Sequence, residues 1–131
     1  MKYASAFFAI IIVILVLDVL WLKFVMGSIF KSEIGDIALQ TPRLAPAVMF
    51  YLMYAVGVLI LVAIPGASMP WYRALATGAL LGLMAYGTYE LTNMATLKPW
   101  TWKIASIDMA WGTFITAVSA VAGRKALVMF S

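Results

Sequence analysis

The chain has 131 residues, of which 66% are hydrophobic and 11% are charged, and its formal net charge is +4. Soluble domains contain about 45–50% apolar and about 25% charged residues, so this composition indicates a polytopic membrane protein. The length leaves room for one helical bundle and for no separate soluble domain. Cysteine and histidine are absent, which excludes disulfides, Ser-His-Asp or thiol catalysis and the usual zinc and haem ligands. We therefore expect no cofactor, no metal centre and, because the basic residues are scattered, no nucleic-acid partner.

Apolar stretches long enough to cross the roughly 30 Å hydrocarbon core as helices follow one another along the chain. They are Tyr3–Leu22, Ala45–Ile64, Ala74–Met94 and Ile104–Ala122. The sequence thus predicts an all-α fold, a four-helix transmembrane bundle that forms a single domain over residues 1–131. The first stretch is too long for a signal peptide, contains Asp18 and is followed by no A-x-A-like site, so we expect an uncleaved helix.

The segment Lys23–Leu44 joins the first two predicted spans. Its apolar residues recur at helical spacing: Met26, Phe30, Ile34, Ile37 and Ala38. This pattern favours a short amphipathic helix lying in the membrane interface. A polar loop with a few apolar anchors is the alternative.

Four spans place both termini on the same side of the membrane. The basic residues are Lys2, Arg73, Arg124 and Lys125 on the side of the termini, and Lys23, Lys31, Arg43, Lys98 and Lys103 on the other. This nearly even division does not orient the protein by the positive-inside rule. A homodimer of two antiparallel copies would show the same balance, as would a chain whose loop charges carry no signal.

Carboxylates inside the predicted spans are the most informative feature of the sequence. Asp18, Glu90 and Asp108 lie within spans, whereas Glu33 and Asp36 lie in the first connection. An ionised acid at the bilayer centre costs roughly 2.5–3.5 kcal/mol, so such residues usually serve a function. Because successive helices alternate in direction, all three intramembrane acids fall in one leaflet, roughly 7–12 Å below the loop lysines at ~1.5 Å rise per residue. We expect them to converge in one site and to share protons.

Aromatic and polar residues accompany these acids. Tyr86, Glu90 and Asn93 share one stripe of the third span, and Asp108 and Trp111 share one face of the fourth. We expect a cavity lined by carboxylates, phenols, an amide and an indole. The candidate ligand-binding or proton-handling residues are Asp18, Tyr51, Tyr54, Tyr86, Tyr89, Glu90, Asn93, Asp108 and Trp111.

Each acid also has a plainer interpretation. Asp18 would snorkel to the interface beside Lys23, and Asp108 would be a first-turn acid stabilised by the helix dipole. Glu90 would be a structural hydrogen-bonding residue.

Small residues indicate where helices pack closely, and tryptophans indicate where the helix ends meet the membrane interface. Ala74, Gly78 and Gly82 form a small-xxx-small stripe that lets helices approach closely, and we favour contact within the bundle over dimerisation. The tryptophans at the ends of the spans are typical of an interfacial belt. They are Trp71, Trp100 and Trp102.

Motifs in all four spans resemble those of a bacterial membrane-protein family catalogued as domain of unknown function 2177. The motifs are Asp18-x-x-Trp21-Leu22, Phe50-Tyr51-x-x-Tyr54, the run from Tyr86 to Leu97 followed by Trp100, and Asp108-Met109-Ala110-Trp111-Gly112. The resemblance implies a four-helix, multi-pass protein of the bacterial inner membrane. It implies no activity.

Three functions remain compatible with the sequence. The site would bind or transport a cation or a small polar molecule, with proton exchange at Glu90 coupled to movement. Alternatively, a lipid-phase enzyme would use Glu90 and Asp108 as acid and base on an isoprenoid or acyl chain, with Tyr86, Tyr89 and Trp111 along the path. The third possibility is an accessory subunit of a membrane complex. Whether the protein is an enzyme stays open.

Overall fold

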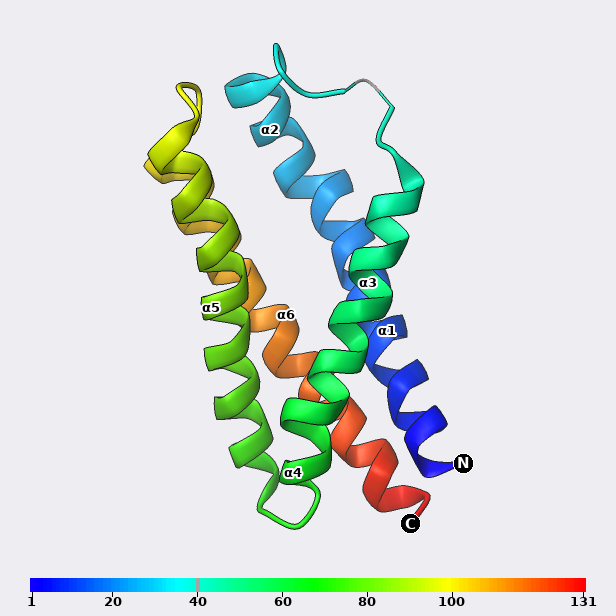
Figure 1. Ribbon diagram of the computed structural model, residues 1–131. Coiled ribbons are helices and arrows are strands. Elements are labelled where there is room, and N and C mark those ends of the chain that lie inside the picture. Colours follow the sequence, from blue (N-terminus) through cyan, green and yellow to red (C-terminus); the bar gives the residue numbers. More distant parts are fainter. Residues whose placement is uncertain (40) are drawn as a thin grey trace.

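The computed structural model describes residues 1–39 and 41–131, and within them the chain forms four helical segments and no strand. The helices are α1 (Lys2–Trp21), α2 (Gly27–Ile34), α3 (Leu44–Val58), α4 (Ile64–Gly66), α5 (Trp71–Thr96) and α6 (Trp102–Met129), and the π-helical turns are η1 (Leu22–Met26) and η2 (Leu59–Ala63). Figure 1 shows them as a bundle with both termini at one end. The predicted all-α four-helix fold is confirmed.

The first helical segment is longer than its predicted range. It passes from α1 through η1 into α2 without a break, so the expected end at Leu22 falls inside a continuous helix from Lys2 to Ile34. The short helix expected in the first connection is present as α2, but as an extension of the first span. Met26 of the turn is fully buried and packs with Trp100 and Ile104, which holds this extension against α6.

The third and fourth helices also exceed the predicted ranges 74–94 and 104–122. α5 starts directly after Pro70, whose fixed φ suits the residue before a first helical turn. α6 starts after Thr101, whose side-chain oxygen accepts a hydrogen bond from the backbone N–H of Ile104 at 3.3 Å. Such side-chain caps satisfy amide groups that have no partner within the helix, and therefore set its first residue.

The helical segments differ in how apolar they are. Within the described residues, three helices are long and apolar enough to cross a membrane, namely Lys2–Ile34, Leu44–Gly66 and Trp102–Met129. α5 is 26 residues long but is not among these three. Its second half carries Glu90, Asn93 and several hydroxyl side chains, which lower its hydropathy.

α6 is the central helix of the bundle. It packs along both α5 and α1, while α3 packs mainly on α1. A methyl group added to Gly82 would lie 2.2 Å from the carbonyl oxygen of Gly112, and one added to Gly78 would lie 3.0 Å from the Cα atom of Ala117. The small-residue stripe of α5 therefore permits close approach to α6, as predicted for contact within the bundle.

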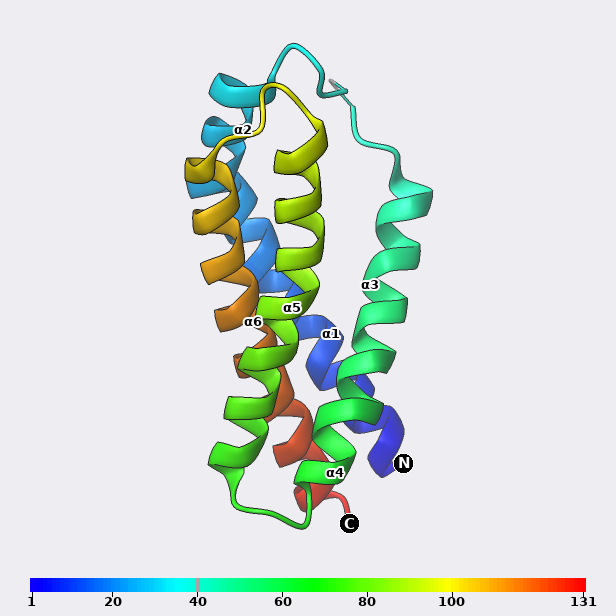
Figure 2. The ribbon, with the colours of Figure 1, turned by 60° about the vertical axis from the view of Figure 1, so that its left-hand side comes forward.

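The bundle is closed in one half and open in the other. In the terminal half (residues 2–14, 55–82 and 112–129), η2 and α4 contact α5 and α6, and Ile10, Val62 and Ile115 are buried. In the open half (residues 15–34, 44–54 and 83–111), no residue of α3 before Tyr54 is buried. Figure 2 shows this part of α3 standing away from α5.

Candidate functional site

Asp18 is held inside the open half by two hydrogen bonds from other helices. The hydroxyl of Tyr51 on α3 donates to Oδ2 at 2.5 Å, and Nε1 of Trp111 on α6 donates to Oδ1 at 2.9 Å. Asp18 therefore ties α1, α3 and α6 together, and does not snorkel toward Lys23.

Trp111 also forms an aromatic pair with Trp21 at the end of α1. The two rings are parallel, with centroids 4.4 Å apart and an interplanar angle of 1°. Nε1 of Trp21 is buried and has no hydrogen-bond partner among the described residues. Trp21 belongs to one of the family motifs but is not among the site residues predicted from the sequence. Its position three residues after Asp18, on nearly the same helix face, is the signal that could have found it.

Glu90 is the most deeply buried acid, with an exposed fraction of 0%. Its Oε1 accepts a hydrogen bond of 2.8 Å from Nε1 of Trp100, whereas Oε2 is buried without a partner among the described residues. The α5–α6 turn folds Trp100 back over α5, with the backbone N–H of Trp100 donating to the carbonyl of Leu97 at 3.2 Å.

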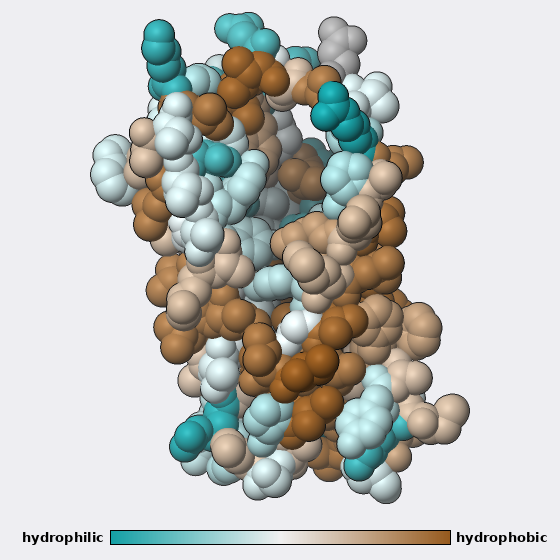
Figure 3. All heavy atoms as spheres, viewed as in Figure 1, coloured by the Kyte–Doolittle hydropathy of each residue, from teal (hydrophilic) through white to brown (hydrophobic). Residues whose placement is uncertain are grey.

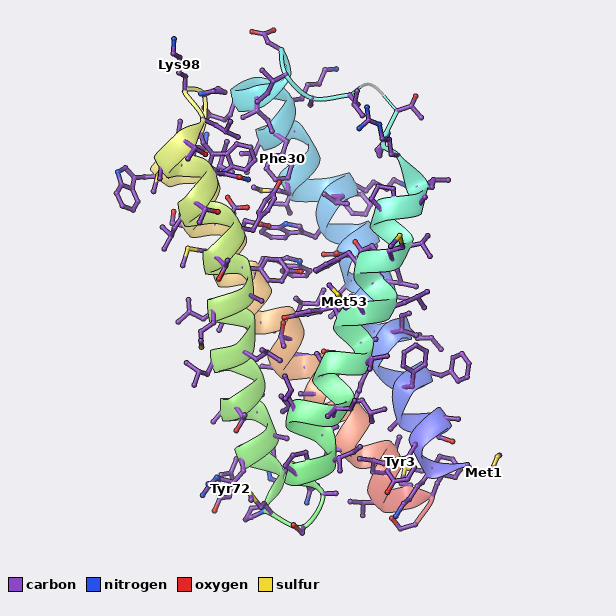
Figure 4. All side chains as sticks on the ribbon, in the orientation of Figure 1. Met1, Tyr3, Phe30, Met53, Tyr72 and Lys98 are labelled. Carbon is purple, nitrogen blue, oxygen red and sulfur yellow. The ribbon has the colours of Figure 1, made fainter. Side chains whose placement is uncertain are left out.

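This contact corrects the prediction that Trp100 belongs to an interfacial belt. The ring is 7% exposed and also packs against Phe30 of α2, with centroids 6.2 Å apart. Figure 4 shows Phe30 in the upper interior, between α2 and α5. Trp71 and Trp102, by contrast, are exposed. Sequence position alone does not separate these tryptophans, because all three lie next to a helix end.

Asp108 is the acid that interacts with both of the others. It is buried on α6, and it interacts electrostatically with both Glu90 and Asp18. No acidic residue lies in the first turn of α6, which starts at Trp102, so the first-turn interpretation of Asp108 is wrong. The intramembrane acids thus converge in one site, as the alternating helix directions predict.

Tyrosines on α3 and α5 complete the site. The hydroxyl of Tyr54 and Oγ1 of Thr116 are 2.6 Å apart in a buried hydrogen bond, and the ring of Tyr54 meets that of Tyr86 edge to face at 6.3 Å. Tyr86 lies directly on the backbone of Gly112, where an added methyl group would be 2.1 Å from the ring. Close approach at Gly112 therefore positions Tyr86 beside the acids.

A cleft of about 250 Å³ opens on this site and is lined by Phe50, Ala85, Tyr86, Tyr89 and Asp108. It lies where α3 and α5 separate, and Figure 3 shows the surface hollowed there in the upper half of the molecule. Asp108 is the one acid in its lining. The cleft therefore presents a carboxyl group among aromatic rings.

Asn93 is the candidate residue least integrated into the site. It is half-buried on α5, and its side chain forms none of the hydrogen bonds that link the acids to their partners. Its neighbour Tyr89 is half-exposed and meets Trp100 edge to face with centroids 5.8 Å apart. Asn93 therefore lies at the margin of the site.

The electrostatics of the site are acidic throughout. Among the described residues, no Lys or Arg is found among the groups that act on Glu90 and Asp108. Lys103 instead pairs with Glu33 at 3.7 Å, near the helix ends. The described residues also contain no group of three or more acids placed to hold a metal ion.

The fold and the site together define a small polytopic membrane protein with an acidic, aromatic site in one half of its bundle. Residues 3–125 match the family described as "Predicted membrane protein (DUF2177)", and the chain belongs to this family. The family resemblance of the sequence motifs is thereby confirmed. No curated protein and no solved structure matches the chain. The family description names a membrane protein and no activity, so the function has to be argued from the site.

Proposed function

We propose that this membrane protein binds a small organic cation in the cleft between α3 and α5, as the first step of its transport. The observation that carries this proposal is the placement of the Asp108 carboxyl group among the rings of Phe50, Tyr86 and Tyr89. A carboxylate attracts an ammonium group through its charge, and ring faces attract it through their quadrupole.

The lining favours an organic cation over an inorganic one. Metal cations require cages of several oxygen ligands, and the described residues contain no such group of acids. The cleft volume of about 250 Å³ is below the roughly 300–1,000 Å³ that is usual for drug-sized ligands. A compact ammonium compound with an apolar substituent matches both the size and the aromatic lining.

The architecture also favours entry of the cation from one end of the bundle. The cleft lies in the open half, while in the terminal half η2 and α4 close the space between α3 and α5. Transport would then require these contacts to loosen after the cation has bound. In a ligand-driven transition of this kind, the ligand must interact more strongly with one arrangement than with the other.

Binding can be measured with the purified protein in lipid nanodiscs by calorimetric titration of benzyltrimethylammonium. Empty nanodiscs correct for partition into lipid. Asp108→Asn removes the charge but keeps the shape, and we expect it to weaken binding about tenfold or more, which corresponds to about 1.4 kcal/mol. Asp36→Asn, in the exposed connection, is the matched control and should bind like wild type. Equal affinity for wild type and Asp108→Asn would refute the proposed site.

Transport is measured separately. Proteoliposomes should take up labelled benzyltrimethylammonium faster than protein-free liposomes, and Asp108→Asn should remove the difference. Binding without uptake would limit the function to binding.

A lipid-phase enzyme is the second candidate, and the contact between Glu90 and Asp108 favours it. Among the described residues, one buried oxygen of Glu90 has no partner, and the neighbouring Asp108 opens on an aromatic cleft. Two adjacent acids can exchange protons with a bound substrate as general acid and base. Lipid mass spectrometry of cells with and without the gene tests this function, and an unchanged lipid profile under several growth conditions would argue against it.

A further inference from the structure

We infer that a cation entering the cleft displaces a proton from Asp108, while Glu90 remains a neutral acid that donates its own O–H to the Asp108 carboxylate. This inference rests on the proposed function and adds its regulation: binding is an exchange of a cation for a proton. The three acids differ in their surroundings, and this difference decides which of them can exchange its proton.

Asp18 is the acid whose two oxygens already have partners. Both of its oxygens accept a hydrogen bond, from Tyr51 at 2.5 Å and from Trp111 at 2.9 Å. An indole N–H can only donate, so the contact with Trp111 uses Oδ1 as an acceptor. Both oxygens of Asp18 are thus engaged by their own partners, and Asp18 takes no part in the exchange.

Glu90 is the acid built to be neutral. It is 0% exposed, and among the described residues no Lys or Arg acts on it. An ionised carboxylate in such surroundings would lack compensation for its lost hydration. The two oxygens differ as they do in a carboxylic acid: Oε1 accepts from Trp100, and Oε2 has no donor directed at it. Oε2 is thus free to carry the proton and to donate it to an acceptor.

Asp108 is the acid that can change its protonation state. It alone among the three lines the cleft. The groups that act on it from the surrounding helices are Asp18, Trp21, Tyr51, Tyr86, Tyr89 and Glu90. None of these groups is a cation, and Asp108 itself is buried. Asp108 therefore keeps its proton in the empty site. We expected proton exchange at Glu90 from the sequence, but burial separates Glu90 from the cleft and favours Asp108.

The exchange balances in charge. The O–H bond of Asp108 breaks, the proton passes to water, and the remaining carboxylate pairs with the incoming ammonium group. The Oε2–H of Glu90 then donates to that carboxylate without leaving Glu90. One positive charge enters and one leaves, so the net charge of the site stays the same, which matters because an added charge within the membrane is costly.

Calorimetry in two buffers tests this inference. Titrating benzyltrimethylammonium into nanodisc-embedded protein, in phosphate and in Tris at the same pH, should give heats that differ by the ionisation enthalpies of the buffers, corresponding to one proton released per cation bound. Equal heats in both buffers, with binding intact, would overturn the exchange and leave the proposed binding function standing. Absence of binding in either buffer would refute both.

Infrared difference spectroscopy shows which carboxyl group loses its proton when the cation binds. Cation binding to wild type should remove the carbonyl band of one protonated carboxyl group. Glu90→Gln keeps an acceptor oxygen for Trp100 and an N–H donor for Asp108. We expect weaker binding, but the same proton release per cation bound and the same loss of that band. Loss of proton release in Glu90→Gln, with binding intact, would overturn the assignment to Asp108. Thermal unfolding of each variant shows whether an altered result reflects a folded protein.

Discussion

The two halves of this bundle use the same helices but are held together by different interactions. In the terminal half, glycines and alanines bring backbones into contact, as at Gly78 against Ala117. In the open half, α3 is attached to its neighbours by the hydrogen bonds of Tyr51 and Tyr54. The difference indicates that stability and site chemistry are separated along the bundle axis.

A physical reason for this separation lies in the membrane. Lipid tails are as apolar as leucine side chains, so helices in lipid associate through close packing and polar contacts, and not through the hydrophobic effect. Small residues provide the first kind of contact and leave no space for a ligand. The open half relies on the second kind, which leaves the cleft beside Asp108 accessible.

The largest effect should follow from disturbing the close packing. Gly82→Ala places a methyl group 2.2 Å from the Gly112 carbonyl oxygen, and the backbone there cannot yield as a flexible side chain would. We expect a loss of about 3 kcal/mol or more in the free energy of unfolding, at the upper end for overpacking, measured by denaturant titration in mixed micelles.

Gly57→Ala is the matched control, because an added methyl group there meets nothing within 4 Å. It should leave stability unchanged or raise it slightly, since alanine favours helix over glycine. If both variants unfolded alike, close helix contact at Gly82 would not be what stabilises this region.

The next effect should come from Asp18. Asp18→Asn replaces one of the two oxygens that Tyr51 and Trp111 bind, and it places an amide N–H where one of these donors points. We expect a loss of about 2–3 kcal/mol, because a buried donor is left without its acceptor. Tyr51→Phe removes one bond only and should have a smaller effect, while Tyr72→Phe, at an exposed position, should have none. A stable Asp18→Asn protein would show that packing and not hydrogen bonding holds α3.

A somewhat smaller loss is expected for Trp100→Phe. The variant keeps an aromatic ring but removes the N–H that donates to Glu90, which leaves a buried polar atom without a partner, at a cost of about 1–2 kcal/mol. Trp102→Phe is the control, because Trp102 is exposed. Thermal unfolding in detergent compares the two variants, and similar melting temperatures would contradict a structural role for the Trp100–Glu90 bond.

The smallest effect is expected for the ion pair between Glu33 and Lys103, whose atoms are 3.7 Å apart near the helix ends. Because Lys103 is largely exposed, Glu33→Gln should change the free energy of unfolding by about 0–1 kcal/mol. High salt should abolish even that difference. A loss of unfolding free energy as large as that of Asp18→Asn would mean that the ion pair at the helix ends stabilises the open half as much as the interior hydrogen bonds do.

Much of the architecture could be predicted because it depends on local patterns. Apolar runs of membrane-spanning length indicated the helices, and alternating direction placed Asp18, Glu90 and Asp108 at one level. The spacing of Gly78 and Gly82 indicated a close helix contact. Each inference needs only residue spacing and the geometry of a helix. The structure confirms the helical fold and the close contact, and it brings the three acids near one another.

The partners of individual side chains could not be predicted in this way. The sequence determined the class of protein, the helices and the shared depth of the acids, because hydropathy and helical rise are properties of each segment alone. Only the tertiary structure decided that Trp100 folds back onto Glu90, that Trp21 stacks on Trp111, and that Asp108 and not Glu90 reaches the cleft. These contacts depend on the rotation of each helix about its axis and on the distance between helices, which packing among all the segments sets together.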